Sequence, residues 1–154
     1  MVINYAHKRG IHCESASTKN LLKFRGYDMS EVLVFGISGG YDFIHLPIPL
    51  FQGGESPVFR SLPGKIFKQF SKRMKLDYCI YKYSNPDKSM QALDNYLNQG
   101  IPVGLVTEIT TLPYFPVKYG EFAGHSIVIV GKEGDEYIVA DTDANIKDDS
   151  FQRL

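Results

Sequence analysis

The sequence predicts a single α+β domain whose helices precede most of its β-sheet. Runs with apolar residues at three-to-four spacing lie in the first two thirds of the chain, and short runs rich in β-branched residues lie in the last third. The length of 154 residues, 44% of them hydrophobic, is enough for one domain with a real core and too little for two ordinary domains. We therefore expect residues 1–154 to fold as one unit.

The first expected helix covers Cys13 to Arg25. Its apolar stripe consists of Ala16, Leu21, Leu22 and Phe24. Gly26 follows at the position where helices commonly take a left-handed cap. Cys13 should therefore lie in the first turn of this helix.

A second, short helix is expected after Ser30, a favoured N-cap residue, and should stop in the glycine-rich segment 36–40. Its apolar residues are Val32, Leu33 and Phe35. Two interpretations of Gly39 and Gly40 stay open: a turn between elements, which we favour, or a close backbone approach to substrate in an oxyanion or substrate-binding site. No phosphate-loop spacing with Lys-Ser or Lys-Thr follows, so no nucleotide site is expected.

Residues 41–61 mix aromatic residues with prolines and a Gly-Gly pair, which predicts a short strand followed by an irregular segment. His45 lies in this segment and is interpreted as a surface or loop histidine. Pro63 fits the first turn of a third helix that ends near Met74. This helix has apolar residues at three-to-four spacing and several lysines.

Segment 76–83 alternates like a strand, and its aromatic neighbours favour a core position for Cys79. Asp87 or Ser89 should cap a fourth helix that ends at Gly100. The expected buried stripe of this helix consists of Met90, Leu93, Tyr96 and Leu97.

The last third of the chain predicts three strands, Ile101–Val106, His125–Val130 and Tyr137–Ala140. Glu133-Gly134-Asp135 should close a hairpin between the second and third strands. Because a hairpin brings its two strands into lateral contact, His125 at the start of one and Asp141 at the end of the other should be near neighbours. Residues 110–120, with two aromatic residues between prolines, predict a stiff loop that overhangs the cleft beside His125 and Asp141.

The order Cys13, His125, Asp141 is typical of a thiol nucleophile, a base and an orienting acid. Thiols attack acyl carbonyls as thiolates, and a helix N-terminus and a nearby imidazole both lower a thiol pKa. Cys13 alone would more simply be a small buried residue on a helix, but its combination with the other two favours catalysis. Asp143 lies two residues after Asp141 on the same strand face and stays an alternative acid.

Two blocks of sequence resemble the N-terminal domain of butirosin biosynthesis protein H. The first is Gly10-Ile11-His12-Cys13-Glu14-Ser15, followed by Leu21-Leu22, Gly26, Ser30-Glu31, Phe35-Gly36-Ile37-Ser38-Gly39-Gly40 and Phe43. The second is Gly124-His125-Ser126-Ile127-Val128-Ile129-Val130-Gly131 with Ala140-Asp141, which is also similar, more loosely, to papain-like and bacteriocin-leader-processing cysteine peptidases. One departure is Thr142, where related peptidases often have proline.

The resemblance implies a papain-like fold, with the nucleophile at the N-terminus of a central helix packed on an antiparallel sheet that carries the histidine and the acid. It places the nucleophile at Cys13, the base at His125 and the acid at Asp141. The founding member transfers an aminoacyl chain from an acyl carrier protein thioester to an aminoglycoside amine. Because that member carries further C-terminal sequence, this chain would correspond to the N-terminal domain of a longer protein.

Two further histidines are candidate contributors to the oxyanion or substrate-binding site, beside the backbone N–H of the nucleophile. His7 lies six residues before Cys13, where papain-like enzymes commonly place a glutamine. His12, directly before Cys13, either adjusts the thiol or bonds the backbone of the turn, and we favour the second role because adjacent helical residues point apart. Glu14 most simply complements the helix dipole.

Composition excludes several classes of function. Seventeen basic and seventeen acidic residues cancel without a long single-sign run, so neither nucleic acid nor a membrane surface is an expected partner. The N-terminus lacks a signal-peptide layout, and the two cysteines are expected to be reduced, so we expect a cytoplasmic protein. No Cys-x-x-Cys or His-x-x-x-His pair occurs, so neither a metal nor another cofactor is expected.

The sequence therefore favours cysteine-dependent acyl transfer through an acyl-enzyme, from a carrier-protein thioester to an amine in the biosynthesis of a secondary metabolite such as an antibiotic. An acyl carrier protein or a peptide is the expected partner. The alternatives are a cysteine peptidase or thioester hydrolase of the same fold, and a non-catalytic module that binds a peptide or carrier.

Overall fold

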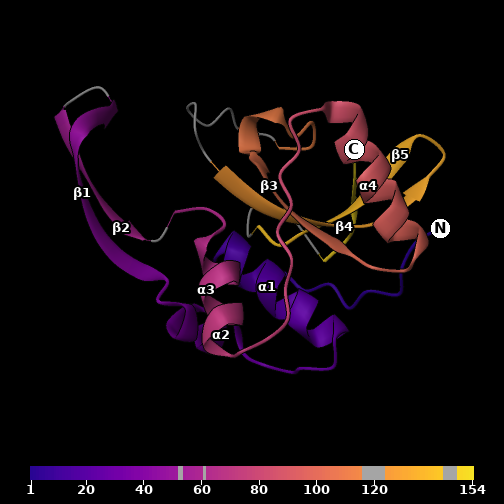
Figure 1. Cartoon of the computed structure of the whole chain (residues 1–154), viewed down its shortest axis with the longest axis horizontal. Coiled ribbons are helices and arrows are strands. Elements are labelled where there is room, and N and C mark those ends of the chain that lie inside the picture. Colours follow the sequence, from indigo (N-terminus) through magenta and orange to yellow (C-terminus); the bar gives the residue numbers. More distant parts are fainter. Residues whose placement is uncertain (52–53, 61, 116–123, 144–148) are drawn as a thin grey trace.

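The computed structural model describes residues 1–51, 54–60, 62–115, 124–143 and 149–154, and for residues 43–60 it describes the backbone only. In this part of the chain, four α-helices accompany a four-stranded antiparallel sheet and a separate two-stranded hairpin (Figure 1). The predicted α+β class is therefore confirmed. No helix in the described ranges is long and apolar enough to cross a membrane.

Helix α1 (Cys13–Phe24) begins at the predicted residue. Gly26 follows it with φ 89°, a left-handed conformation that glycine adopts at little cost. Helix α2 (Glu31–Ser38) begins as predicted after Ser30, whose hydroxyl accepts the Leu33 N–H at 3.3 Å. These two helices pack with α3 (Lys65–Arg73) around a small core of Leu22, Val34, Ile66 and Phe70.

The four-stranded sheet has the order β3 (Val103–Glu108), β4 (Gly124–Glu133), β5 (Glu136–Asp141), β6 (Gln152–Arg153). The predicted hairpin between the second and third of these strands is confirmed, with Gly134 in its turn at φ 61°. Strand β6 was not predicted, because its two residues are too short to show any periodicity.

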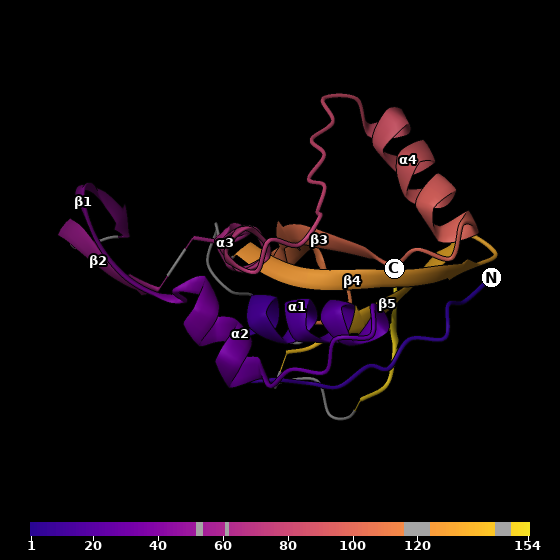
Figure 2. The same ribbon diagram turned by 60° about the horizontal axis from the view of Figure 1, so that its bottom comes forward.

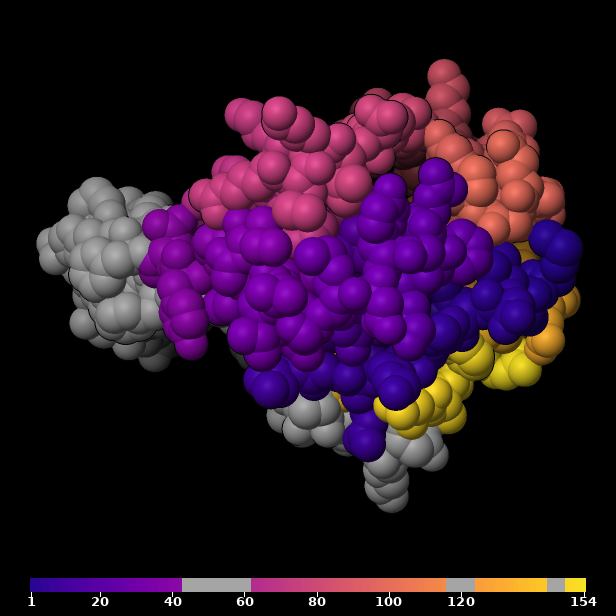
Figure 3. Space-filling model, turned by 90° about the horizontal axis from the view of Figure 1, so that it is seen from below, coloured from indigo at the N-terminus to yellow at the C-terminus, as the bar shows by residue number. Residues whose placement is uncertain are grey.

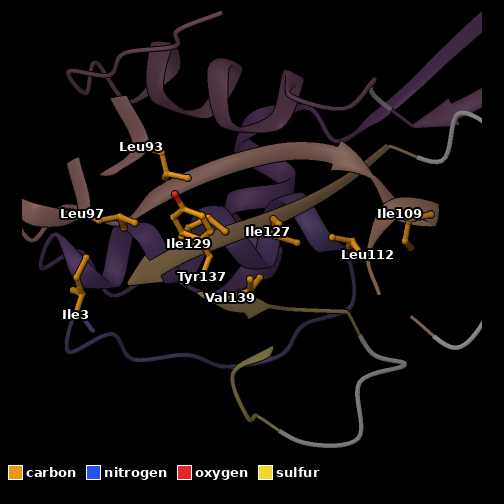
Figure 4. Packing of buried hydrophobic residues seen from close by; sticks show 9 residues of the cluster. All are labelled: Ile3, Leu93, Leu97, Ile109, Leu112, Ile127, Ile129, Tyr137 and Val139. Carbon is orange, nitrogen blue, oxygen red and sulfur yellow. The ribbon is translucent and has the colours of Figure 1, made fainter. Parts of the chain in front are cut away.

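Helices cover both faces of this sheet, with α1 on one side and α4 (Pro86–Asn98) on the other (Figure 2). Side chains of β4 and β5 alternate between two cores, as the period of a strand requires. The core on the α4 side contains Ile3, Leu93, Leu97, Ile109, Leu112, Ile127, Ile129, Tyr137 and Val139 (Figure 4). The core on the α1 side contains Tyr5, Val128, Val130, Ile138 and Ala140, against which Leu21 and Phe24 pack.

Segment 41–61 folds differently from the prediction. The predicted short strand and irregular segment are instead two paired strands, β1 (Tyr41–Phe51) and β2 (Gly54–Arg60), in a hairpin that projects from the body (Figure 1). The prolines that argued against pairing are tolerated because each strand of a two-stranded sheet is an edge strand. The side chain of His45 lies outside the described residues.

The predicted strand over 76–83 is wrong: this segment is not a strand, and Cys79, expected in the core, is exposed. Alternation alone cannot make a strand without a neighbour for its backbone hydrogen bonds. The segment instead leads away from the body to α4 (Figure 2).

Two predicted helix starts shift. Helix α4 is capped by Asn85, which accepts the Lys88 N–H at 3.0 Å, and not by Asp87 or Ser89. Pro86 then takes the first helical position, which proline suits. Helix α3 begins at Lys65 after a left-handed Gly64, two residues later than predicted.

Seen from below, the middle of the molecule is formed by the purple residues of α2 and the segments next to it in the sequence (Figure 3). Of the apolar residues predicted for this helix, Val32 is 77% exposed and Leu33 53% exposed. The buried face of α2 is provided by Val34 and Ser38 instead. A short apolar run predicts a helix more reliably than it predicts which face is buried.

Candidate active site

The candidate nucleophile is the first residue of α1. His12 precedes it as N-cap, with extended backbone angles and an Nδ1 that accepts the Ser15 N–H at 3.4 Å. This is the backbone role that we favoured for His12. The imidazole also packs edge-on against Phe35, with ring centroids 5.4 Å apart. Cys13 is half-buried and not part of a disulfide.

The turn before Cys13 is held by the carboxylate of Glu31, the first residue of α2. This carboxylate accepts the backbone N–H groups of Ile11 at 3.1 Å and His12 at 2.9 Å, and the Ser15 hydroxyl at 3.0 Å. Gly10 makes this approach possible, because a Cβ there would come within 2.5 Å of the Glu31 carboxylate. The direction in which α1 presents its first residue is therefore fixed from α2.

Glu14 lies in the first turn of α1, as predicted, and has a second role that the sequence did not predict. Its buried carboxylate accepts the backbone N–H groups of Gly64 and Phe67, each at 3.0 Å, so it also caps α3. Burial raises the pKa of Glu14, and hydrogen bonds from the start of α3 oppose that change. Glu14 thus anchors α3 beside the candidate nucleophile.

His125 and Asp141 meet as the hairpin predicts. His125 Nε2 lies 2.9 Å from each carboxylate oxygen of Asp141, and the two side chains are 2% and 0% exposed. His125 lies on β4, in which residues 125–131 are all buried because helices cover both faces of the sheet.

Burial opposes protonation of His125, but hydrogen bonds to Asp141 and Cys13 outweigh it and raise the pKa of His125 to about 9. The imidazole is therefore protonated at neutral pH. Because Nε2 faces Asp141, Nδ1 is the nitrogen left to interact with the thiol of Cys13. The three side chains that the sequence singled out come together in this order.

A buried hydroxyl pair, Thr142 with Ser17, joins the elements that carry these three side chains. The Thr142 hydroxyl donates to the carbonyl of Cys13 at 3.0 Å and lies 3.3 Å from the Ser17 hydroxyl. The Ser17 hydroxyl in turn lies 3.3 Å from the carbonyl of Ser126, the residue after His125. Proline at position 142 could not make these bonds, so the departure from related peptidases has a structural consequence here.

Sequence reasoning missed two residues at this site, Tyr114 and Phe115. The Tyr114 hydroxyl donates to Asp141 Oδ2 at 2.9 Å, and the Phe115 ring packs edge-on against His125 with centroids 5.4 Å apart. Both belong to the aromatic loop predicted to overhang the cleft, of which the part from residue 116 on lies outside the described residues. The available signal was the pair of aromatic residues between prolines.

Of the two candidate acids, the structure brings Asp141 to the histidine. Asp143 donates its backbone N–H to Asp141 Oδ1 at 3.0 Å, so it helps to orient the carboxylate from the main chain.

His7 lies half-buried on the Asp141 side of the site, with its ring stacked on Phe151 at 5.6 Å. Burial lowers the pKa of His7, and Asp149 and Asp141 oppose that change. An oxyanion donor binds the substrate oxygen and need not contact Cys13, so the oxyanion role of His7 stays a prediction.

Gly39 and Gly40 have a clear packing role. Gly39 is the left-handed C-cap of α2 at φ 68°, and a Cβ on Gly40 would collide with the Phe35 ring at 2.5 Å. The favoured interpretation of a turn therefore accounts for both glycines. Phe35 lies between Gly40 and His12, the residue before the candidate nucleophile.

The arrangement contains the groups that acyl-thioester chemistry uses. It provides a thiol at a helix start, a protonated imidazole beside it and a buried carboxylate that holds the imidazole. Within the described ranges, no three metal-binding side chains gather at one place.

Comparison with known proteins gives one family. The family model described as "Butirosin biosynthesis protein H, N-terminal" matches residues 12–142, a range that contains Cys13, His125 and Asp141. No curated protein and no solved structure matches the chain.

Proposed function

Because this chain belongs to the family of the butirosin biosynthesis protein H N-terminal domain, we propose that it is a cysteine-dependent acyltransferase of secondary-metabolite biosynthesis. The observation that supports the chemistry best is the buried His125–Asp141 pair beside Cys13 at the start of α1. In this proposal the chain has a papain-like fold, in which α1 is the central helix packed on the sheet. Residues 1–154 act as one catalytic domain.

In the first half-reaction, the thiolate of Cys13 attacks the carbonyl carbon of an aminoacyl or peptidyl thioester. A carbon–sulfur bond to Cys13 forms, and the bond to the carrier thiol breaks. The departing thiolate takes the proton from His125, so the imidazole becomes neutral. Backbone N–H groups at the start of α1 face the developing oxyanion, because the first turn of a helix leaves them without helical partners.

In the second half-reaction, an amine attacks the acyl-enzyme. Neutral His125 takes a proton from the amine, an amide bond forms, and the thiolate of Cys13 leaves. Asp141 stabilises the imidazolium that is restored. The acyl donor is an acyl carrier protein or a peptide-like substrate. With water instead of an amine as acceptor, the same steps give a thioester hydrolase or peptidase.

Incubation with a small aminoacyl thioester, followed by intact-protein mass spectrometry, tests this proposal. The expected result is an added acyl mass on Cys13, absent from Cys13→Ala and strongly reduced in His125→Ala. Cys79→Ala is the matched control, because Cys79 is the other cysteine and is exposed. Acylation that is lost with Cys79, or that Cys13→Ala leaves intact, would favour the non-catalytic binding module.

Release of the acyl group separates the two enzymatic alternatives. Adding amine acceptors to the isolated acyl-enzyme should give an amide product faster than water gives the free acid. Release at the same rate with and without every amine tested would identify a hydrolase.

A further inference from the structure

Tyr114 makes a contact that neither the triad nor the family assignment accounts for. Its hydroxyl donates to Oδ2 of Asp141, one of the two oxygens that lie 2.9 Å from His125 Nε2. Three donors therefore converge on one buried carboxylate: the imidazole, the Tyr114 hydroxyl and the backbone N–H of Asp143.

The position of Tyr114 is fixed independently of the carboxylate. The chain enters this segment through the short helix η1 (Ile109–Thr111), and Ile109 and Leu112 are both buried in the core on the α4 side of the sheet. The Tyr114 ring lies 5.9 Å from that of Phe115, which packs against His125. The hydroxyl is thus held toward Asp141 by packing, and the hydrogen bond requires little further ordering of the side chain.

We propose that Tyr114 is a positioning residue that shares the Asp141 carboxylate with His125 and thereby limits how tightly Asp141 holds the proton on the imidazole. A hydroxyl donor stabilises negative charge on the oxygen that it binds, and an oxygen stabilised in this way attracts the imidazolium less strongly. Because the side chains of His125 and Asp141 are almost fully buried, solvent screens this interaction only weakly.

Several titratable groups face this pair from the elements around it. Cys13 faces His125 from α1, and Asp141 faces it from β5. His7 faces Asp141 from the N-terminal segment, and Tyr114 faces it from the loop after η1. Burial and the Asp141 charge both raise the pKa of Tyr114, so the phenol stays a neutral donor over the range in which His125 titrates.

This inference deepens the proposed function and rests on it for its catalytic meaning. In the second half-reaction, His125 must lose its proton before it can accept one from the amine. A carboxylate that holds this proton too tightly would slow that step, so the Tyr114 hydroxyl adjusts the imidazole to work as both acid and base.

An NMR titration of the histidine rings tests the proposal without requiring any turnover. Tyr114→Phe keeps the ring and its packing and removes only the hydroxyl. The expected result is a rise of about half to one pH unit in the His125 pKa, or roughly three- to tenfold tighter proton binding. His125→Asn assigns the resonance among the four histidines.

Tyr137→Phe is the matched control. The Tyr137 hydroxyl donates to Asp94 at 2.7 Å, so this variant also loses one tyrosine–carboxylate hydrogen bond, in a different part of the sheet. The His125 pKa should not change in the control. An unchanged or lowered His125 pKa in Tyr114→Phe, or an equal rise in Tyr137→Phe, would overturn the proposal.

If the NMR spectra of Tyr114→Phe cannot be assigned, a second measurement reports the same His125 pKa. The rate of Cys13 alkylation by iodoacetamide should show an alkaline inflection where His125 loses its proton, and this inflection should move to higher pH. Because neither measurement needs a substrate, both can succeed if no thioester acylates Cys13. In that case the proposed function fails while the positioning role of Tyr114 stands.

Discussion

Replacing Asp141 with asparagine should remove a part of this protein's stability that depends on pH in a defined direction. The His125 pKa is 6.5 in an unfolded chain and about 9 in the folded one. A group with a raised folded pKa contributes stability that is fully present below its unfolded pKa and is lost as the pH rises through its folded pKa. The His125 contribution should therefore be complete below pH 6.5 and absent above about pH 9.

The difference of about 2.5 pH units corresponds to about 3 kcal/mol at roughly 1.4 kcal/mol per unit. In Asp141→Asn the charged partner is gone, so burial should keep the imidazole neutral. The asparagine can still accept the Asp143 N–H, so the rest of the loss is largely independent of pH.

Urea unfolding of both proteins at pH 6, 7.5 and 9.5 measures this effect. The stability gap between wild type and variant should be about 3 kcal/mol larger at pH 6 than at pH 9.5. Asp94→Asn is the control: the pKa of Asp94 is lowered by Tyr137 and Lys132, so its contribution is already complete at pH 6 and should stay flat. A gap for Asp141→Asn that also stays flat would refute the reasoning.

The same comparison in a Cys13→Ala background removes the other group that titrates against His125. The pH dependence should persist there in reduced form, because the hydrogen bond to Asp141 is the leading interaction that raises the His125 pKa. Complete loss of the pH dependence would assign the effect to the thiol.

Variants at three further places test the surroundings of the site. Thr142→Val should lower stability by roughly 1–3 kcal/mol in urea unfolding, because the carbonyl of the nucleophile loses its donor, and Thr142→Ser should restore most of it; equal losses would contradict this. Glu31→Ala should speed hydrogen exchange of the two amides that its carboxylate binds, whereas unchanged exchange would show that the turn holds itself. Lys68, Lys72 and Lys75 are exposed on α3 and just after it, and they form the basic face that an acidic carrier protein would meet. Reversing all three to glutamate should weaken carrier binding without slowing acylation by a small thioester, and unchanged carrier affinity would remove this face from consideration.

Local patterns in the sequence predicted the elements that carry the candidate site. The start of α1 at Cys13 and the turn after Arg25 follow from apolar spacing and from Gly26, all within one stretch of chain. The meeting of His125 and Asp141 follows from a hairpin whose turn and strands are also adjacent in sequence.

Local sequence patterns did not predict features that depend on residues far away in the chain. Segment 76–83 alternates like a strand but is not one, and this leaves Cys79 exposed. From the sequence, Glu14 is an acidic residue that complements the dipole of its own helix. In the structure its carboxylate also caps α3, which follows about fifty residues later. In both cases the outcome depends on which backbone groups remain unpaired after the chain has folded.

The sequence by itself determined the α+β class, the helix that starts at Cys13 and the hairpin that joins His125 to Asp141, because helix periods, caps and tight turns act over a few residues. The tertiary structure alone decided that Tyr114 shares the Asp141 carboxylate, that Glu31 holds the turn before the nucleophile and that Thr142 binds its carbonyl. Each of these contacts joins segments that come together only when the sheet and α1 pack, and no local propensity specifies such a meeting.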